Sequence, residues 1–362
     1  MKHGLKWLDS DMHMAEPWDL WRGYIDPELE DKVYEWAGAS KGYSGLISGP
    51  TENIREVRRQ RRHEYDAYVG GDGSYVDPAG QLRAMDREGI DVAVLYPTLA
   101  LGVNRAPDVA AAVALRHAFN GWLHDFCAYE PARLKMNGMI YVGDVDAAVA
   151  EIRRAKEFGA VSIFLDPRPN REPFDDPVYE PIWTAAEECQ LAIGFHNGLS
   201  GQMEARYGAY PTHLYTHASS RPVGHMCTFM ELLFGGVLER HPLLHCAFLE
   251  AGASWVSYWL FRLEAEWEKF GQFQGDAYQN LEQPPVEYWK RQCWAAVECE
   301  EWSLPGLIAS IGDDNLVLSS DFPHFDSAFP EAGEKFMSIP GLSQESKRKI
   351  LWDNCARLYH LD

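Results

Sequence analysis

Short apolar runs alternate along the chain with longer segments whose apolar residues recur at helical spacing. Each run is rich in Val, Ile, Leu, Phe or Tyr and is bounded by Gly, Pro, Asp or Asn, which is typical of a buried strand. We therefore predict eight strands, at Lys6–Met14, Val92–Thr98, Leu134–Val142, Ala160–Pro167, Leu191–Gly198, Leu243–Ala251, Cys293–Glu300 and Leu316–His324.

The segments between these runs are predicted helices. In Asp144–Phe158, for example, Val145, Val149 and Ile152 fall on one apolar stripe. Similar patterns cover Asp108–Cys127, Val178–Cys189, Pro222–Arg240, Trp255–Phe270 and Ser343–Leu361. Strands that alternate with helices favour parallel pairing, and a count of eight favours closure. We expect an α/β fold, a (β/α)8 TIM-type barrel; the alternative, an open doubly wound sheet, lacks its usual Gly-x-Gly-x-x-Gly signature here.

One segment, residues 18–78, lacks this alternation and follows the first predicted strand. It carries the one basic cluster, Arg55–Arg62, whose default explanation is a solvated helix face or a subunit contact. We expect a helical insertion, or cap, within a single barrel domain over residues 1–362. The cap and the loop Leu199–Ser220 are expected to shape the pocket, and we expect a homo-oligomer.

The charge balance excludes several partners. Lys and Arg number 33 against 54 Asp and Glu, a net charge of −21, so the surface repels nucleic acid phosphates and anionic membranes. No apolar run is long enough to span a bilayer, and the start shows no signal-peptide pattern. Seven scattered cysteines without a Cys-x-x-Cys pair indicate reduced thiols, and we expect a cytoplasmic protein.

Ionisable residues interrupt the apolar runs at the predicted carboxyl ends of four strands. In chain order they are Asp11, His13, Glu16, His196, Glu250 and Asp321. These strand ends converge at one face of a barrel, and a period of two places Asp11 and His13 on the same side. Because buried carboxylates without countercharge are costly, a divalent cation is the simplest group that neutralises several of them. We therefore predict a metal site.

These residues resemble the amidohydrolase superfamily, and more closely its amidohydrolase-2 branch of metal-dependent hydrolases and decarboxylases. The resemblance covers nearly the whole chain. It rests on Asp11-x-His13, Glu16-Pro17, His196, Phe248-Leu249-Glu250-Ala251-Gly252 and Ser320-Asp321-Phe322-Pro323-His324. It implies a (β/α)8 barrel, with metal ligands carried over to Asp11, His13, His196 and Asp321.

The chain departs from the family pattern at three places. Hydrolases of the superfamily usually begin with His-x-His, whereas Asp11 takes the first position here, as a carboxylate can in decarboxylases of the branch. Glu250 stands where those enzymes present a His on strand six, and the strand-four run Ile163–Asp166 has no Lys suited to carbamylation. Two His with up to four carboxylates suit Mn or Fe better than Zn, and match the ligand set of di-iron carboxylate proteins.

The Asp-x-His-x-x-Glu start is similar to that of nonheme dinuclear iron monooxygenases on the amidohydrolase fold. This resemblance implies hydroxylation of a small organic substrate by dioxygen, with electrons from a ferredoxin or reductase. It implies two Fe ions, with candidate ligands Asp11, His13, Glu16, His196, His225, Glu250 and Asp321. The alternative is one Zn or Mn ion in a hydrolase or nonoxidative decarboxylase, in which Asp321 shuttles a proton.

Further residues are candidates for the same site. His225, near the predicted start of the fifth helix, is either a third nitrogen ligand or an acid/base group, with a helix-capping or surface role equally open. His324 is expected to orient a ligand through a hydrogen bond. Tyr96, Trp294 and Glu298 are expected to line the pocket, although core packing explains the two aromatic residues equally well.

Overall fold

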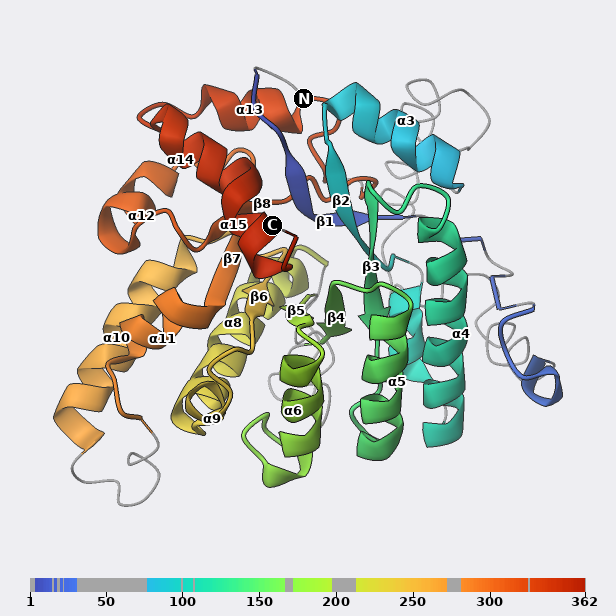
Figure 1. Ribbon diagram of the computed structural model, residues 1–362. Coiled ribbons are helices and arrows are strands. Elements are labelled where there is room, and N and C mark those ends of the chain that lie inside the picture. Colours follow the sequence, from blue (N-terminus) through green and yellow to red (C-terminus); the bar gives the residue numbers. More distant parts are fainter. Residues whose placement is uncertain are drawn as a thin grey trace.

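The structure is a computed structural model of the whole chain (Figure 1). Most of the predicted insertion at 18–78 lies outside the described residues. Residues 199–212 of the predicted loop Leu199–Ser220 also lie outside them. The insertion therefore stays a prediction. The structure describes residues 4–14, 16–17, 20–21, 23–30, 77–98, 100–106, 108–166, 172–196, 213–271, 281–324 and 326–361.

Eight strands form one parallel sheet in chain order. They are β1 (Leu8–His13), β2 (Val92–Tyr96), β3 (Leu134–Met139), β4 (Ser162–Leu165), β5 (Ala192–Phe195), β6 (Cys246–Phe248), β7 (Cys293–Val297) and β8 (Leu316–Leu318). Across the seam between the first and last strands, the His13 N–H donates to the Phe322 carbonyl over 2.7 Å, and the Asp321 N–H to the Asp11 carbonyl over 3.2 Å. The predicted (β/α)8 TIM-type barrel is confirmed as a nearly closed barrel.

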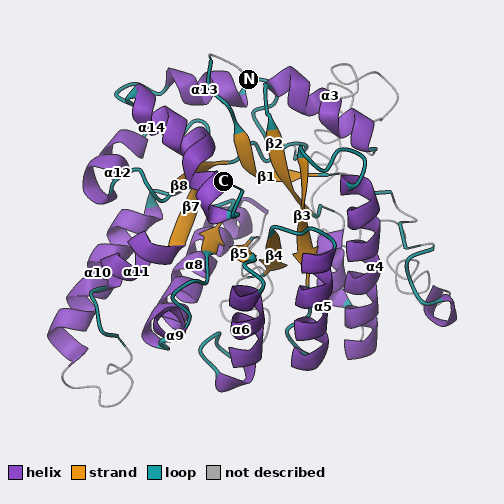
Figure 2. Ribbon diagram, in the orientation of Figure 1, coloured by secondary structure: helices purple, strands orange, loops and turns teal. Residues whose placement is uncertain are grey.

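Helices surround the strands on the outside of the barrel (Figure 2). They are α3 (Pro78–Glu88), α4 (Val109–Cys127), α5 (Val145–Glu157), α6 (Glu180–Glu188), α8 (His213–Phe234), α9 (Val237–Arg240), α10 (Trp255–Phe270), α11 (Pro285–Gln292), α12 (Leu304–Ile311), α13 (Ala332–Ser338), α14 (Gln344–Arg348) and α15 (Asn354–Leu358), with short turns η3 (Ala100–Arg105), η4 (Pro177–Tyr179) and η7 (Lys349–Asp353).

Aspartate caps explain where two predicted helices begin. The Asp108 carboxylate accepts the Ala111 N–H at 2.8 Å, and that of Asp144 accepts the Ala147 N–H at 3.0 Å. Each carboxylate satisfies a backbone donor that the first turn leaves free, so α4 and α5 start one residue after the predicted boundary.

The predicted start of the fifth helix at Pro222 is wrong. Proline suits a first helical turn, but here Pro222 lies inside α8, which begins at His213. At the other end, Gly236 adopts a left-handed φ of 73° and separates α8 from α9, which the prediction joined. The correction matters for the site, because it places Arg221 within the helix.

Tyr96 fills the barrel interior beneath the strand ends. Its side chain is fully buried, and its hydroxyl lies 3.2 Å from that of Tyr359. The ring passes so close to Gly194 of β5 that a Cβ there would overlap the Tyr96 hydroxyl. The absence of a side chain at Gly194 therefore makes room for Tyr96, two residues before His196.

We expect Gly194→Ala to lower the free energy of unfolding by about 1–3 kcal/mol, because the added methyl group overpacks a closed core. Gly306→Ala in α12 is the matched control, since no atom lies within 4 Å of its new Cβ. The control should be neutral or stabilising by up to about 1 kcal/mol, because Ala favours helix over Gly. Urea unfolding measures both, and equal stability of the two variants would contradict this packing argument.

The thiols agree with the sequence expectation. All seven cysteines are free, and five of them are buried. None of the helices in the described ranges combines the length and apolar composition that crossing a membrane requires. The cytoplasmic location stays a prediction.

Candidate metal centre

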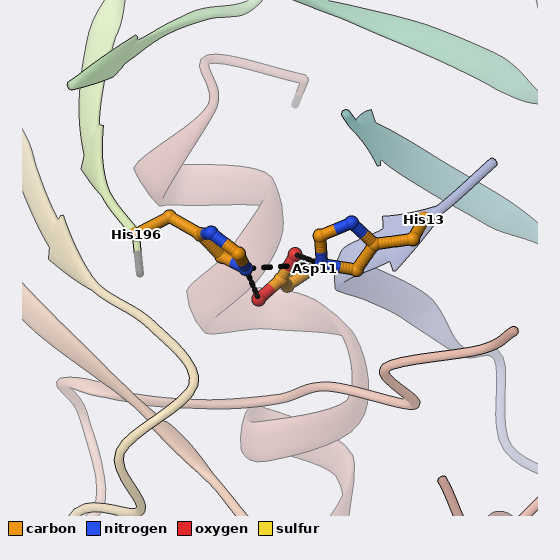
Figure 3. Close-up of side chains that lie close together, drawn as sticks. All are labelled: Asp11, His13 and His196. Atoms are coloured by element: carbon orange, nitrogen blue, oxygen red, sulfur yellow. Dashed lines mark hydrogen bonds and ion pairs between the residues drawn. The ribbon is translucent and has the colours of Figure 1, made fainter. Parts of the chain in front are cut away.

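Three side chains converge at the carboxyl ends of β1 and β5 (Figure 3). Asp11 and His13 belong to β1, His196 follows β5, and all three are 0% exposed. The Nε2 atoms of His13 and His196 lie 3.0 Å apart. Asp11 Oδ1 lies 3.3 Å from the first of these nitrogens, and Oδ2 lies 3.3 Å from the second. One candidate ligand atom from each residue lies within 4.8 Å of the others, so the three are close enough to share one cation.

Asp9 holds the end of β1 against the segment after β8. Its Oδ1 accepts the N–H of Asp11 at 3.2 Å and that of Ser320 at 3.0 Å. The pairing of β1 with β2 shifts register between Asp9 and Met12, at the same place. Sequence analysis missed Asp9, although its spacing of two residues from Asp11 places it on the same side of an extended strand.

A backbone carbonyl fixes the ring of His13. The Pro97 oxygen lies 2.8 Å from Nδ1, and because a carbonyl only accepts, Nδ1 carries the proton. Nε2 therefore directs its lone pair toward Asp11 and His196. Histidines that bind metals are oriented by a hydrogen bond of this kind.

Asp321, after β8, lies beside this group with a left-handed φ of 53°. Its Oδ1 is 3.4 Å from His13 Nε2 and 2.7 Å from His324 Nδ1. The other ring nitrogen of His324 lies 3.3 Å from the Thr98 hydroxyl. His324 thus contacts Asp321 directly, but Asp321 Oδ1 has no hydrogen-bond partner among the described residues, so the supporting hydrogen bond from His324 stays a prediction. His13, Asp321 and His324 also have candidate ligand atoms within 4.8 Å of one another.

Glu250 connects the group to a cation that sequence analysis missed. Glu250 Oε2 is 3.1 Å from His196 Nε2, while Oε1 forms an ion pair with Arg221 Nη2. Glu250 has a left-handed φ of 57°, which turns the chain sharply after β6. The sequence prediction left Arg221 between the loop Leu199–Ser220 and the helix from Pro222, and gave it no role in the site.

His225 and Glu16 face other partners. His225 Nε2 donates to the Leu249 carbonyl at 2.6 Å, and Glu16 Oε1 accepts the N–H groups of Thr98 at 3.0 Å and Ala100 at 3.1 Å. Both side chains are buried, and among the described residues neither belongs to a group of converging candidate ligands. Through these hydrogen bonds, His225 stabilises the segment that contains Glu250, and Glu16 stabilises the segment that contains Thr98. Their roles as ligands, and that of His225 in catalysis, stay predictions.

The residues predicted to line the pocket divide between core and site. The Tyr96 ring lies 5.3 Å from that of His196, directly beneath the site. Trp294 is 1% exposed and packs 4.7 Å from the ring of His245, so it belongs to the core. The carboxylate of Glu298 adds to those of Glu250, Asp321 and Asp326 in raising the pKa of the Arg221 guanidinium against the effect of burial.

Burial decides which protonation states the group favours. It raises the pKa of Asp11 to about 7 and that of Asp321 well above its ordinary value. It lowers the pKa of His196 to about 4 and that of His13 well below its ordinary value, so both imidazoles are neutral, as metal ligands must be. Neither oxygen of Asp11 has a hydrogen-bond partner within the described part of the chain. These orphaned oxygens and the mixed N/O donor set fit a divalent cation.

The sequence model of the amidohydrolase family matches residues 9–361. The chain belongs to this amidohydrolase family. A curated relative, the 2-amino-3-carboxymuconate-6-semialdehyde decarboxylase of Dictyostelium discoideum, is 23% identical over 295 residues, 80% of this chain and 79% of the relative. The gamma-resorcylate decarboxylase of Rhodococcus jostii (strain RHA1) is 24% identical over 306 residues, 78% of this chain and 87% of the relative.

Among solved structures, this amidohydrolase is similar to the 5-carboxyvanillate decarboxylase of Novosphingobium aromaticivorans. That structure superposes with a TM-score of 0.72 at 19% identity, over 99% of this chain and 97% of the other. It is a complex with manganese and 4-hydroxy-3-methoxy-5-nitrobenzoic acid. At this level of identity the likeness shows a shared fold.

The comparisons correct the predicted activity. Both curated relatives are decarboxylases, so the prediction of a dinuclear-iron monooxygenase, an oxidoreductase, is wrong. The predicted dioxygen and ferredoxin or reductase partners are wrong with it, since loss of CO2 from an acid needs neither oxygen nor electrons. The findings support a metal-dependent enzyme, and the Asp11, His13 and His196 group fits one cation rather than the predicted two Fe ions.

The structure explains why the prediction of two Fe ions is wrong. The prediction of two cations relied on four converging carboxylates that lacked countercharge. Glu250 is paired with Arg221, and Glu16 accepts two backbone N–H groups. Fewer carboxylates therefore depend on a metal for neutralisation than the sequence suggested.

Proposed function

We propose that this chain is a metal-dependent, nonoxidative decarboxylase of a small carboxylic acid. The observation that carries the proposal is the position of Asp321, a carboxyl group whose pKa burial raises, beside the Asp11, His13 and His196 group. Exchange of CO2 for a proton requires an acid near the reacting carbon and positive charge near the substrate oxygens. The decarboxylase relatives support the same function.

In this proposal Asp11, His13 and His196 hold one divalent cation. A cation held there would supply Lewis-acid charge that favours binding of the substrate oxygens. Two imidazoles with a carboxylate suit both Mn and Zn. We propose manganese, because the similar 5-carboxyvanillate decarboxylase was crystallised with it.

Asp321 is the proposed acid. Burial, together with the negative charges of Asp326 and Asp11, raises its pKa, which favours the protonated form that a proton donor needs. Asp321 donates this proton to the carbon that bears the substrate carboxylate. The bond from that carbon to the carboxylate then breaks, its electron pair returns to the unsaturated system, and CO2 leaves. The product carries the proton from Asp321, which ends the step as a carboxylate.

His324 is placed to return the proton. Its Nδ1 lies 2.7 Å from Asp321 Oδ1, and the two side chains are 17% and 16% exposed, so water reaches both. The Thr98 hydroxyl near Nε2 holds the ring in this orientation. A proton from solvent can therefore pass through the imidazole to Asp321 after each turnover.

Release of CO2 from gamma-resorcylate and 5-carboxyvanillate tests the proposal, because relatives act on these two acids. Protein stripped of metal and reloaded with stoichiometric Mn²⁺ is assayed in air and under nitrogen. We expect manganese-dependent CO2 release at the same rate in both, with deuterium from D2O on the carbon that lost CO2. Oxygen consumption, a hydroxylated product, or no metal-dependent CO2 release from these or a wider panel of unsaturated carboxylic acids would contradict it.

A further inference from the structure

The guanidinium of Arg221 has hydrogen-bond donors that have no partner among the described residues. Its Nη2 pairs with Glu250, whereas Nε and Nη1 have no hydrogen-bond partner in the part of the chain that the structure describes. Buried donors without partners are rare in native proteins, because each costs the free energy of its lost hydration. The unused donors of Arg221 therefore point to a ligand.

Arg221 keeps its positive charge in this setting. Burial alone would lower the pKa of the guanidinium, but nearby carboxylates, those of Glu250 and Asp321 foremost, raise it. Glu250 also fixes where the guanidinium lies, since Oε1 contacts Arg221 and Oε2 is 3.1 Å from His196 Nε2. The Glu250 carboxylate thus lies between the positively charged guanidinium of Arg221 and the candidate metal ligand His196.

Arg221 lies on the accessible side of the site. The side chains of Asp11 and His13 are 0% exposed, whereas those of Arg221 and Asp321 are each 16% exposed and that of His324 is 17% exposed. The partly exposed groups mark the side from which a molecule can reach the buried ligands. The Arg221 side chain belongs to this partly exposed set, and its Nε and Nη1 atoms lie on the buried part of that side chain.

We propose that Arg221 binds a second carboxylate of the substrate, one that stays on the product, so that dicarboxylic acids are preferred over monocarboxylic acids. The claim that this anion is a substrate rests on the proposed function. A guanidinium N–H donates a strong charge-assisted hydrogen bond to a carboxylate oxygen, and each of the two donors without a partner, Nε and Nη1, can supply one such bond. The retained carboxylate is the better candidate, because the departing one loses its charge as CO2 forms, and a guanidinium bound to it would stabilise the substrate more than the transition state.

If Arg221 only supports Glu250 and binds no ligand, substitution of Arg221 is expected to affect ligand binding differently. If the guanidinium served only to neutralise and orient Glu250, Nη2 would suffice. Loss of Arg221 would then disturb the site in the same way for every ligand. A bound second carboxylate instead makes the effect of Arg221 depend on whether the ligand has one.

Binding of isophthalate and benzoate, which differ only in the second carboxylate, tests the proposal. Isothermal titration calorimetry of the manganese-loaded protein should show isophthalate bound about tenfold or more tightly than benzoate, as one charged hydrogen-bonded pair implies. Arg221→Gln should reduce this ratio to about one, and Arg221→Lys should give an intermediate ratio. Arg153→Gln, which removes an exposed guanidinium paired with Glu188, is the matched control and should keep the wild-type ratio.

Two results would overturn the proposal: equal affinity of the wild-type protein for the two acids, or an Arg221→Gln variant that loses affinity for both equally. If Arg221→Gln does not fold, as judged by thermal unfolding, the ratios of the wild type and Arg221→Lys decide. The titration needs no turnover, so its outcome is separate from that of the proposed function. Arg221-dependent selectivity without CO2 release would count against the decarboxylase alone, and CO2 release without selectivity against this inference alone.

Discussion

Asp321→Asn is expected to lower kcat for CO2 release by about 10²–10⁴-fold, the usual contribution of a general acid. The amide has nearly the shape of the carboxyl group but no proton to donate to carbon. The buried Asp11, His13 and His196 group should keep its geometry, so bound manganese should be unchanged. Steady-state rates of CO2 release and metal content by elemental analysis measure the two quantities.

Asp86→Asn is the matched control for this substitution, because Asp86 is 66% exposed and pairs with Arg133 on the surface. The control should change kcat less than about threefold, since exposed charges contribute little. If Asp321→Asn retains more than a tenth of the wild-type rate, Asp321 is not the acid. If it loses its manganese, Asp321 acts as a ligand instead.

Asp11→Asn should abolish metal binding and activity while it stabilises the metal-free protein. Asp11 is 0% exposed and neither of its oxygens has a hydrogen-bond partner among the described residues, so without a cation its charge is uncompensated. Burial raises its pKa to about 7, and a raised carboxyl pKa means that the folded state loses stability as the group ionises at higher pH. Removal of this charge should raise the unfolding free energy of the metal-free protein by about 1–3 kcal/mol at pH 8.

The opposite signs with and without metal make this second prediction specific. Thermal unfolding in chelator should rank Asp11→Asn above the wild type, and added Mn²⁺ should reverse the order because only the wild type gains binding free energy. The surface variant Asp86→Asn should behave like the wild type in both conditions. A metal-free Asp11→Asn protein that is less stable than the wild type would show that the carboxylate has partners we have not identified.

The barrel could be predicted because its determinants are local. Buried strands need short apolar runs, and helix starts need capping groups such as Asp108 and Asp144, and both are visible within a few residues. Helix boundaries were predicted less well where the local signal conflicted with packing. Pro222 is a typical residue for a helix start, yet α8 continues through it.

The convergence of Asp11, His13 and His196 also followed from the sequence, because any parallel barrel brings the carboxyl ends of its strands to one face. The number of cations did not follow from the sequence. Glu16 accepts backbone N–H groups from the loop after β2, and Glu250 pairs with Arg221, 29 residues away in the chain. No spacing rule predicts such partners. From the sequence alone, all four carboxylates therefore look as if they need a metal for neutralisation, and this favours two Fe ions.

The amino-acid sequence by itself determined the alternation of strands and helices, and the placement of ionisable residues at the strand ends. The tertiary structure alone decided which of those residues are already neutralised by the protein and which remain uncompensated, as Asp11 does. It also decided that Arg221 lies beside the site with two donors that have no partner within the described ranges. The physical reason is that desolvation and hydrogen bonding depend on neighbours in space, and for a charged group these neighbours determine whether it binds protein, metal or substrate.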